Sequence, residues 1–482
     1  MKKNKAYQQV NHWLLMLMLS LPSLIYADSK LTSKNTENIL VLDLERTIQL
    51  ALNNSDKLFD AQSGIRIAEL IKEVNQSEFD LNIYPRGDTG YIGGGTAGSG
   101  VTVGGGVDFE KKLPIGTLIT ISPAMLRAAD KYHSTFQARI SQPLLRGFGR
   151  EYNMAGIRMA EFAERTATRT FYKSMNHTVL RSIELLYDVA KQEELVKLNN
   201  ETYQRLEKFW KATKIKERIG LSNGLDLYRA EMEMKQAEGS LHQSYEFLQD
   251  AKDLLRDILA LPPEANFTVN VPLELSKEEW NLEEAINIAL KQRIEIDQGL
   301  DQIDESRRLA KLSEKDLWPD INLVIDYSNL GYGEQFTGSF GSQRESRWGI
   351  GFTTSTDVDR VREKSFYERT LIGVEAAQKA FLEIKKSIAL EVKRTLRTVY
   401  RAREKIDLQK QQIKSLEGGV ELAKAKFLRE FATSFEVIQA EKAFHMAQIN
   451  LFGALIDHKV GEYRLRAVLG LLIEKNTVNL CK

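Results

Sequence analysis

The chain has 482 residues, of which 43% are hydrophobic and 28% charged, with 67 basic and 66 acidic residues. The net charge of +1 is too small to favour binding to nucleic acid, which is therefore not an expected partner. The only cysteine, Cys481, cannot form an internal disulfide, and the six scattered histidines include no metal-spaced pair. We predict no catalytic residue, no metal and no cofactor, so we expect that the protein is not an enzyme.

Residues 1–27 have the composition of a secretory signal peptide. Three lysines precede an apolar run at 14–21, and Ala27 provides a small residue at the expected cleavage point. The run is too short to span a membrane as a helix. Cleavage removes three of the 67 basic residues and leaves 64 against 66 acidic ones, a net charge of −2. A retained anchor is the alternative, because Ile25 is larger than the residue usual at this place.

Two segments far apart in the chain have similar sequences. A predicted amphipathic helix start at 44–52 recurs at 282–290, an offset of 238 residues. Two later pairs of segments share an offset of 210 residues. These are 225–231 with 435–441, and 255–259 with 465–469. Chance similarity between helices is the alternative, but a shared offset at two separate places argues against it.

The two offsets locate an unequal insertion. Their difference (238 − 210) gives the first half 28 additional residues upstream of its long helices. Packed helices tolerate such insertions poorly, since one added residue turns every later side chain by about 100°, whereas loops between strands accept them. We therefore predict two internal structural repeats, 28–270 and 271–472, followed by a short tail at 473–482.

In each half, alternating apolar and polar residues follow the helix start. The period of two predicts one pair of strands at about 81–142 and another at about 319–353. Each strand has one apolar face, which could cover a soluble core or face lipid. The 28 additional residues could form a further surface hairpin with 110–114 as one turn. The alternating apolar residues are Val101, Val103, Val107, Phe109, Phe136, Ala138, Ile140, Ile321, Leu323, Ile325, Tyr327, Trp348, Ile350 and Phe352.

Long stretches without proline predict a helical hairpin in each half. No proline occurs at 144–261 or at 320–482. We expect the hairpins at about 152–261 and about 360–471. A single helix from about 152 to 218 would extend about 100 Å at a rise of 1.5 Å per residue, which no compact domain requires.

Two strand pairs cannot close a membrane barrel within one chain. Single-chain barrels begin at about eight strands, and open sheet edges are not tolerated in lipid. Strands that face lipid would therefore have to be shared between copies. The expectation is a homo-oligomer in which several chains contribute to one barrel.

Residues 140–149, Ile-Ser-Gln-Pro-Leu-Leu-Arg-Gly-Phe-Gly, closely resemble the strand-to-helix junction of one branch of the TolC family of outer-membrane efflux proteins. The two helix starts and the closing segment 465–470 also resemble landmarks of that family, so the resemblance covers nearly the whole chain after 1–27. The junction residues are Gln142, Pro143, Leu144, Leu145, Gly147 and Gly149.

The resemblance implies a mainly α fold with membrane β structure. In that family a trimeric α-barrel of long coiled helices is continuous with a shared transmembrane β-barrel, to which each chain gives four of twelve strands. The implied function is the outer-membrane channel of a tripartite efflux or type I secretion system, a passive duct reaching from the periplasm to the exterior. The implied partners are two further copies of the chain (a homotrimer), a periplasmic adaptor, an inner-membrane transporter and outer-membrane lipid.

The ends of the two helical hairpins are candidates for docking the adaptor. The first tip, Arg218, Ile219, Gly220 and Leu221, resembles the motif with which family members meet their adaptor. A turn between antiparallel helices also needs a glycine for its backbone angles alone. The second tip has different residues, so whether both tips dock the adaptor in the same way is left open. It has Glu430, Phe431 and Ala432 in the corresponding places.

Glu421 and Glu417 are candidates for a periplasmic gate. Family tunnels are often narrowed by acidic rings near the periplasmic mouth, and Glu421 lies nine residues before the second tip, with Glu417 one turn away. Three copies of an acid around a pore would repel one another and attract cations. Ordinary solvated charge beside Lys424 is the alternative.

A non-conducting envelope scaffold or adhesin is the alternative function. Such a protein could use the same strands and coiled helices for structural bridging. The junction at 140–149 and the paired hairpins favour the channel.

Overall fold

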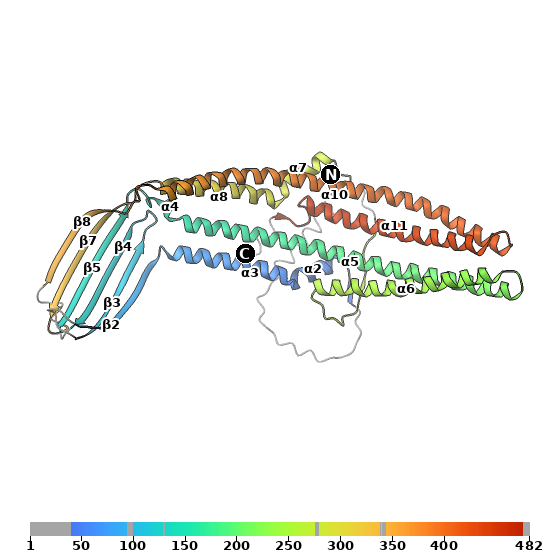
Figure 1. Cartoon of the computed structure of the whole chain (residues 1–482), viewed down its shortest axis with the longest axis horizontal. Coiled ribbons are helices and arrows are strands. Elements are labelled where there is room, and N and C mark those ends of the chain that lie inside the picture. Colours follow the sequence, from blue (N-terminus) through green and yellow to red (C-terminus); the bar gives the residue numbers. More distant parts are fainter. Residues whose placement is uncertain are drawn as a thin grey trace, which may run out of the picture. The chain divides into compact units, whose positions relative to one another are not determined.

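The computed structural model of the chain describes residues 40–93, 100–128, 131–274, 279–337, 339 and 344–475 (Figure 1). The predicted signal peptide and Cys481 lie outside these residues. The chain divides into two compact units. We call Gln62–Arg169 with Asp297–Ile384 the sheet unit, and Met1–Ala61, Thr170–Ile296 and Lys385–Lys482 the tip unit.

The sheet unit contains one antiparallel sheet of six strands, where the sequence predicted two pairs. The segment expected to form a single pair at about 81–142 forms four strands, so that prediction is wrong. The spatial order is β2-β3-β4-β5-β7-β8 (Figure 1). The strands are β2 (Leu81–Ile92), β3 (Gly100–Lys112), β4 (Leu118–Ala128), β5 (Lys131–Pro143), β7 (Ile321–Gly333) and β8 (Arg344–Thr354).

The first half, which has 28 additional residues, forms an additional hairpin within this sheet. β3 and β4 form a hairpin inserted between β2 and β5, and both pair along most of their length. The turn of this hairpin is Leu113–Thr117, where the Leu113 amide donates to the Thr117 carbonyl at 2.8 Å. Residues 110–112, which the sequence assigned to the turn, continue β3 instead.

Four helical segments of the described chain connect to the sheet, all at the same end of its strands (Figure 1). α3 (Asp56–Ser77) leads into β2, and α8 (Ile294–Asp316) leads into β7. β5 continues through the short α4 (Arg150–Asn153) into α5 (Ala155–Arg218), and β8 is followed by α10 (Val361–Leu428).

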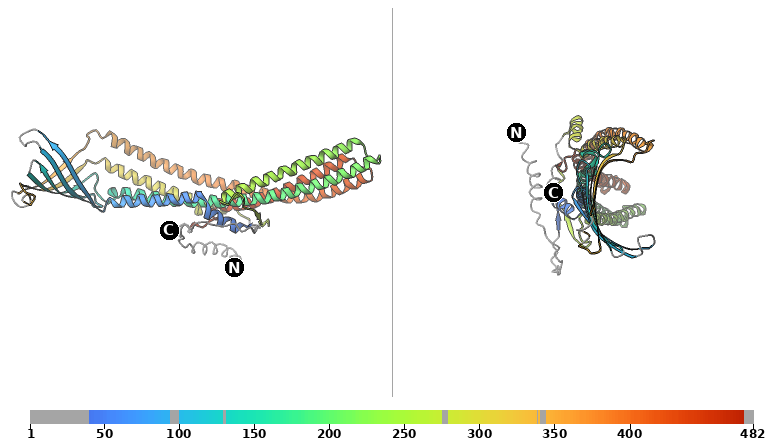
Figure 2. Two further views of the ribbon diagram at one scale, coloured as in Figure 1. Left: turned by 90° about the horizontal axis from the view of Figure 1, so that it is seen from below. Right: turned by 90° about the vertical axis from the view of Figure 1, so that its left-hand side faces the viewer.

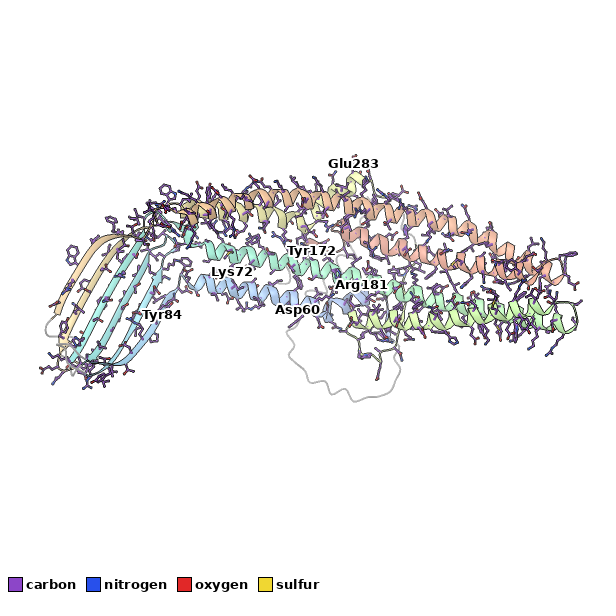
Figure 3. The ribbon with its side chains drawn as sticks, viewed as in Figure 1. Asp60, Lys72, Tyr84, Tyr172, Arg181 and Glu283 are labelled. Carbon is purple, nitrogen blue, oxygen red and sulfur yellow. The ribbon has the colours of Figure 1, made fainter. Side chains whose placement is uncertain are left out.

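Ion pairs and a close helix contact hold these four segments together. Lys72 on α3, labelled in Figure 3, reaches Glu164 on α5 at 2.8 Å. Arg169 on α5 reaches Asp301 on α8 at 2.6 Å. Burial alone would raise the pKa of the Asp301 carboxyl, but hydrogen bonds from Arg169 and Arg165 outweigh it and lower that pKa. A side chain at Gly299 would meet the ring of Phe381 at 2.6 Å, so α8 and α10 approach closely there.

The tip unit contains the distal part of each helical hairpin and a small core. α5 returns as α6 (Gly224–Ile258), and α10 returns as α11 (Ser434–Val468). α2 (Leu44–Asn54), α7 (Leu282–Gln292) and the parallel pair β1 (Leu40–Leu42) with β6 (Phe267–Val269) complete the unit. The core includes the fully buried Leu42, Ile183, Leu186, Tyr187, Leu255 and Leu259.

Helix bounds in the two halves differ by constant numbers of residues. α5 and α10 end at Arg218 and Leu428, and α6 and α11 begin at Gly224 and Ser434, in each case 210 residues apart. α2 and α7 begin 238 residues apart. These are the two offsets found in the sequence. In the described part of the chain, no helix has both the length and the apolar composition needed to cross a membrane.

Candidate functional site

One face of the sheet is mainly apolar across all six strands, and the basic Lys111, Arg127 and Arg344 on this face lie at or next to strand ends. The pairing registers place alternate residues of neighbouring strands on the same side, and this side carries Ile83, Val103, Ile121, Phe136 and Tyr327. On the edge strand β8, Trp348 is 78% exposed. The further apolar members are Leu81, Tyr91, Val101, Val107, Phe109, Ile119, Met125, Ala138, Ile140, Leu323, Ile325, Ile350 and Phe352.

The opposite face of the sheet is polar and carries ion pairs between strands. Arg86 on β2 contacts Asp108 on β3 at 2.8 Å, and Arg139 on β5 contacts Asp326 on β7 at 2.6 Å. Tyr84, labelled in Figure 3, pairs with Asp108 and so belongs to this face. A sheet with one apolar and one polar face has the composition of a membrane barrel wall, whose outside meets lipid and whose inside meets water.

The predicted junction leads β5 into α4 through a hydrogen-bonded turn. Gln142 and Pro143 end the strand, and Leu144 and Leu145 follow it. The Leu144 amide donates to the Ile321 carbonyl at 2.9 Å, which ties the junction to β7. Two residues with positive φ, Gly147 at 83° and Gly149 at 100°, then turn the chain into the helix.

The turn of the β3–β4 hairpin is held against this junction. The Gly149 amide donates to the Ile115 carbonyl at 3.0 Å, and the hydroxyl of Thr117 donates to the side-chain carbonyl of Gln142. Gly116 has a φ of 101°, and a Cβ there would lie 2.7 Å from the Gly147 carbonyl oxygen. The sequence did not connect the turn with the junction, because the two are separated along the chain by β4 and β5.

The two hairpin tips have the same backbone geometry despite their different residues. Gly220 has a φ of 78°, and Glu430 has a φ of 67°. The Leu221 amide donates to the Lys216 carbonyl at 2.8 Å, and the Phe431 amide donates to the Lys426 carbonyl at 2.9 Å. This pattern closes the C-terminus of a helix. The next helix of the first hairpin, α6, is capped by Asn223, whose side chain accepts from the Asp226 amide at 2.8 Å.

Both tips present exposed apolar side chains. Ile219 and Leu221 are exposed at the first tip, and Phe431 is 80% exposed at the second. Arg218 is also exposed, whereas Ala432 is partly buried. Each tip therefore offers an apolar surface that no residue of the described chain covers.

Contacts between the hairpins bring the two tips close together. Lys216 on α5 donates to the Phe427 carbonyl on α10 at 2.9 Å, and its ammonium lies 4.6 Å from the centre of the Phe427 ring. The hydroxyl of Ser434, the first residue of α11, donates to the Asp226 carboxylate on α6. These contacts fix the two tips as one surface.

The gate candidates Glu417 and Glu421 are both exposed on α10. Among the described residues, neither forms an ion pair. Lys424, which the sequence offered as their neighbour, contacts Glu441 on α11 at 2.5 Å instead. Glu417 and Glu421 thus present unneutralised negative charge to the surroundings of α10.

Sequence reasoning missed a polar cluster around Glu441, whose side chain is 3% exposed. Arg205 on α5 contacts this carboxylate at 3.0 Å, in addition to Lys424. His445, one turn along α11, lies 2.8 Å from the Thr202 hydroxyl. Burial and the neighbouring Arg205 lower the pKa of His445, and Glu441 opposes this only in part. Because the partners of Glu441 are on two other helices, α5 and α10, no spacing within the sequence could reveal the cluster.

No group of three or more potential metal ligands occurs among the described residues. His445 instead packs between helices, and its Nε2 lies 2.9 Å from the side-chain oxygen of Asn199.

Comparison with known proteins gives one family match and several structures of the same fold. Residues 285–471 match the family model described as outer membrane efflux protein. No curated protein sequence matches the chain significantly.

Three solved structures of similar fold are bacterial outer-membrane proteins. The outer membrane protein VceC from Vibrio cholerae has a TM-score of 0.70 at 12% identity, covering 89% of this chain and 96% of VceC. The CmeC outer membrane channel of Campylobacter jejuni has a TM-score of 0.69 at 13% identity, covering 95% and 94%. The open state of the MtrE outer membrane channel of Neisseria gonorrhoeae has a TM-score of 0.67 at 14% identity, covering 90% of each chain.

Proposed function

We propose that this chain, whose residues 285–471 match the outer membrane efflux protein family and whose fold is TolC-like, forms the outer-membrane channel of a tripartite efflux or type I secretion system. In this proposal a homotrimer is a passive duct. It carries substrates from a periplasmic adaptor and an inner-membrane transporter to the exterior, without covalent chemistry, metal or cofactor.

The two-faced sheet is the observation that carries the proposal. Its apolar face is suited to outer-membrane lipid, and its polar face, with the Arg86–Asp108 and Arg139–Asp326 pairs, is suited to a water-filled lumen. A soluble scaffold would have no reason to expose rings such as Trp348 and Phe352 on one continuous face. A cleaved signal peptide at 1–27 would deliver the chain to the envelope.

Docking of the adaptor is assigned to both tips. The shared backbone geometry and the exposed Leu221 and Phe431 support equivalent docking, although the residues differ. Arg218, Ile219 and Gly220 at the first tip, and Glu430 and Ala432 at the second, complete this surface. The gate is assigned to Glu417 and Glu421, because both are exposed and carry charge without a neutralising partner in the described chain.

Conductance of the purified protein tests the channel. In planar bilayers the trimer should form cation-preferring pores, and Glu417→Ala with Glu421→Ala should reduce that preference. Deletion of the gene should increase the sensitivity of cells to exported compounds. A correctly assembled trimer that conducts in neither form would favour the non-conducting envelope scaffold or adhesin.

A further inference from the structure

The number of strands exceeds the number of helical connections to the sheet. The four helical segments α3, α5, α8 and α10 are joined to β2, β5, β7 and β8, whereas β3 and β4 join no helix. This extra hairpin lies within the sheet, between β2 and β5. Each chain therefore contributes six strands but only four helices to the structure at the junction.

The extra hairpin has the length and faces of a membrane strand pair. β3 has 13 residues and β4 has 11, as long as their neighbours, and a transmembrane strand requires about 9–11 residues. Val103, Val107 and Phe109 on β3 and Ile119 and Ile121 on β4 lie on the same side as the apolar residues of the other four strands. A surface flap would not need to continue this face in register.

The two edges of the sheet require partners. Within the described residues, no strand pairs with the outer edge of β2 or with that of β8. In lipid, such unpaired backbone groups are strongly unfavourable, because no water is present to hydrogen-bond them. β2 runs away from the helices and β8 runs back toward them, so β8 of one copy can pair with β2 of the next in the antiparallel sense of the whole sheet. The sheet is also curved (Figure 2), as a barrel wall must be.

We propose that the partner of both edges is a second copy of this chain, and that three copies close an eighteen-stranded barrel with β8–β2 seams. This inference relies on the trimer of the proposed function. It differs from the twelve strands that the family resemblance implies, because each chain supplies six.

The perimeters of the β-barrel and of the ring of helices agree best when the barrel has eighteen strands. Strands about 4.8 Å apart and tilted by about 40° occupy about 6 Å of perimeter each. Eighteen strands then give a perimeter of about 110 Å and a backbone radius of about 18 Å, whereas twelve give about 75 Å and about 12 Å. Twelve helices packed about 9 Å apart need about 110 Å. Six strands per four helices therefore match the barrel to the helical wall without a sharp taper.

The wider barrel has a consequence for the cargo. The outer pore would not be the narrowest part of the duct, so solutes that pass the helical tunnel would leave without a second constriction in the barrel. Selection by size would then occur only on the periplasmic side.

Electron cryo-microscopy of the purified full-length trimer gives the direct test. We expect eighteen strands around the barrel, with β3 and β4 in the wall. A conducting trimer with twelve strands, and β3 and β4 folded elsewhere, would overturn this inference and leave the channel intact. A trimer with eighteen strands that conducts no ions would support this inference and overturn the proposed channel function.

Disulfide formation across the seam tests the same inference in the intact chain. In a Cys481→Ser background, Thr89→Cys on β2 is combined with Ser346→Cys, Trp348→Cys or Ile350→Cys on β8, all on the apolar face. Oxidation should yield covalent dimers and trimers for at least one pair. Arg347→Cys and Gly349→Cys are matched controls, because they lie on the polar face and should crosslink several-fold less. No crosslink between chains for any pair, in an intact trimer, would exclude the seam.

Removal of the extra hairpin provides a second variant. Deletion of residues 97–129 removes β3 and β4 and leaves β2 and β5 as neighbours, so the assembled variant should have a barrel of twelve strands. An assembled variant that keeps the barrel diameter of the intact protein would contradict the proposal.

Discussion

Gly220 and Glu430 occupy equivalent positions at the ends of α5 and α10, with φ angles of 78° and 67°. The left-handed backbone that glycine adopts freely is therefore also imposed on a glutamate. The two tips share one backbone geometry, but only the first has glycine, the residue best suited to it.

Replacing Glu430 with glycine should stabilise the second tip. A non-glycine residue in this conformation costs about 1 kcal/mol, so Glu430→Gly should raise the free energy of opening of this tip by about that amount. Hydrogen exchange of the amides around 426–434 in the intact trimer measures it. Ala432→Gly is the control, because Ala432 does not have a positive φ. Faster exchange in Glu430→Gly than in the unchanged protein would contradict the argument.

Charged residues at the tips should weaken adaptor docking. Leu221→Asp and Phe431→Asp each place a carboxylate on an exposed apolar surface, and each should reduce crosslinking to the adaptor and export by about tenfold or more, as expected for the loss of an interface anchor. Gly220→Asp should act in the same direction. Phe247→Asp is the control, since Phe247 is an exposed apolar residue of α6 away from the tip. Normal export by all three tip variants, at normal trimer level, would show that the adaptor docks elsewhere.

A side chain at Gly116 should disrupt the contact between the hairpin turn and the junction. In Gly116→Val the new Cβ would approach the Gly147 carbonyl oxygen and the Pro143 ring to 2.7 and 2.8 Å, and the positive φ adds strain. We expect a loss of about 3 kcal/mol or more and a lower thermal midpoint of the trimer. Gly87→Val is the control, because a Cβ there meets nothing within 4 Å. Equal midpoints for the two variants would argue against the contact.

Mild acid should loosen the packing of α11 against α5 through His445. Its pKa is lowered in the folded protein, so the fold favours the neutral ring. That stabilisation is present above the unfolded pKa of about 6.5 and is lost as the pH falls through the folded value. The thermal midpoint should therefore decline less below about pH 6.5 in His445→Gln than in the unchanged protein. His242→Gln, at an exposed position of α6, should retain the full decline.

The sequence predicted the helices better than the strands. Proline-free stretches and a constant offset defined both hairpins, and α6 and α11 begin and end at the same offset of 210 residues. The 28 additional residues were expected as a surface hairpin and not as strands within the sheet, because the second half has no counterpart to them and because Gly104, Gly105 and Gly106 interrupt the alternation of β3 with residues that have no side chain. The length of the segment would have been informative, because 81–143 is long enough for four strands of the observed size.

The candidate sites depended on contacts that spacing within the sequence does not reveal. The tips were found because a turn between helices has its own local signature. The partners of Glu441 lie on α5 and α10, and the turn at 113–117 meets the junction only after β4 and β5 have returned the chain to it. Such contacts depend on how elements pack, which one sequence does not specify.

The β3–β4 hairpin makes the width of the outer pore a separate variable from the number of helices. Strands added two at a time leave the direction of β2 and β8 unchanged, so the antiparallel seam between copies is preserved, whereas a single added strand would make it parallel. The turn of the added strand pair contacts Gln142, Gly147 and Gly149 of the junction, and the helix that follows the junction is not interrupted. A channel built in this way can change the bore of its exit while keeping the helical surface that its partners contact.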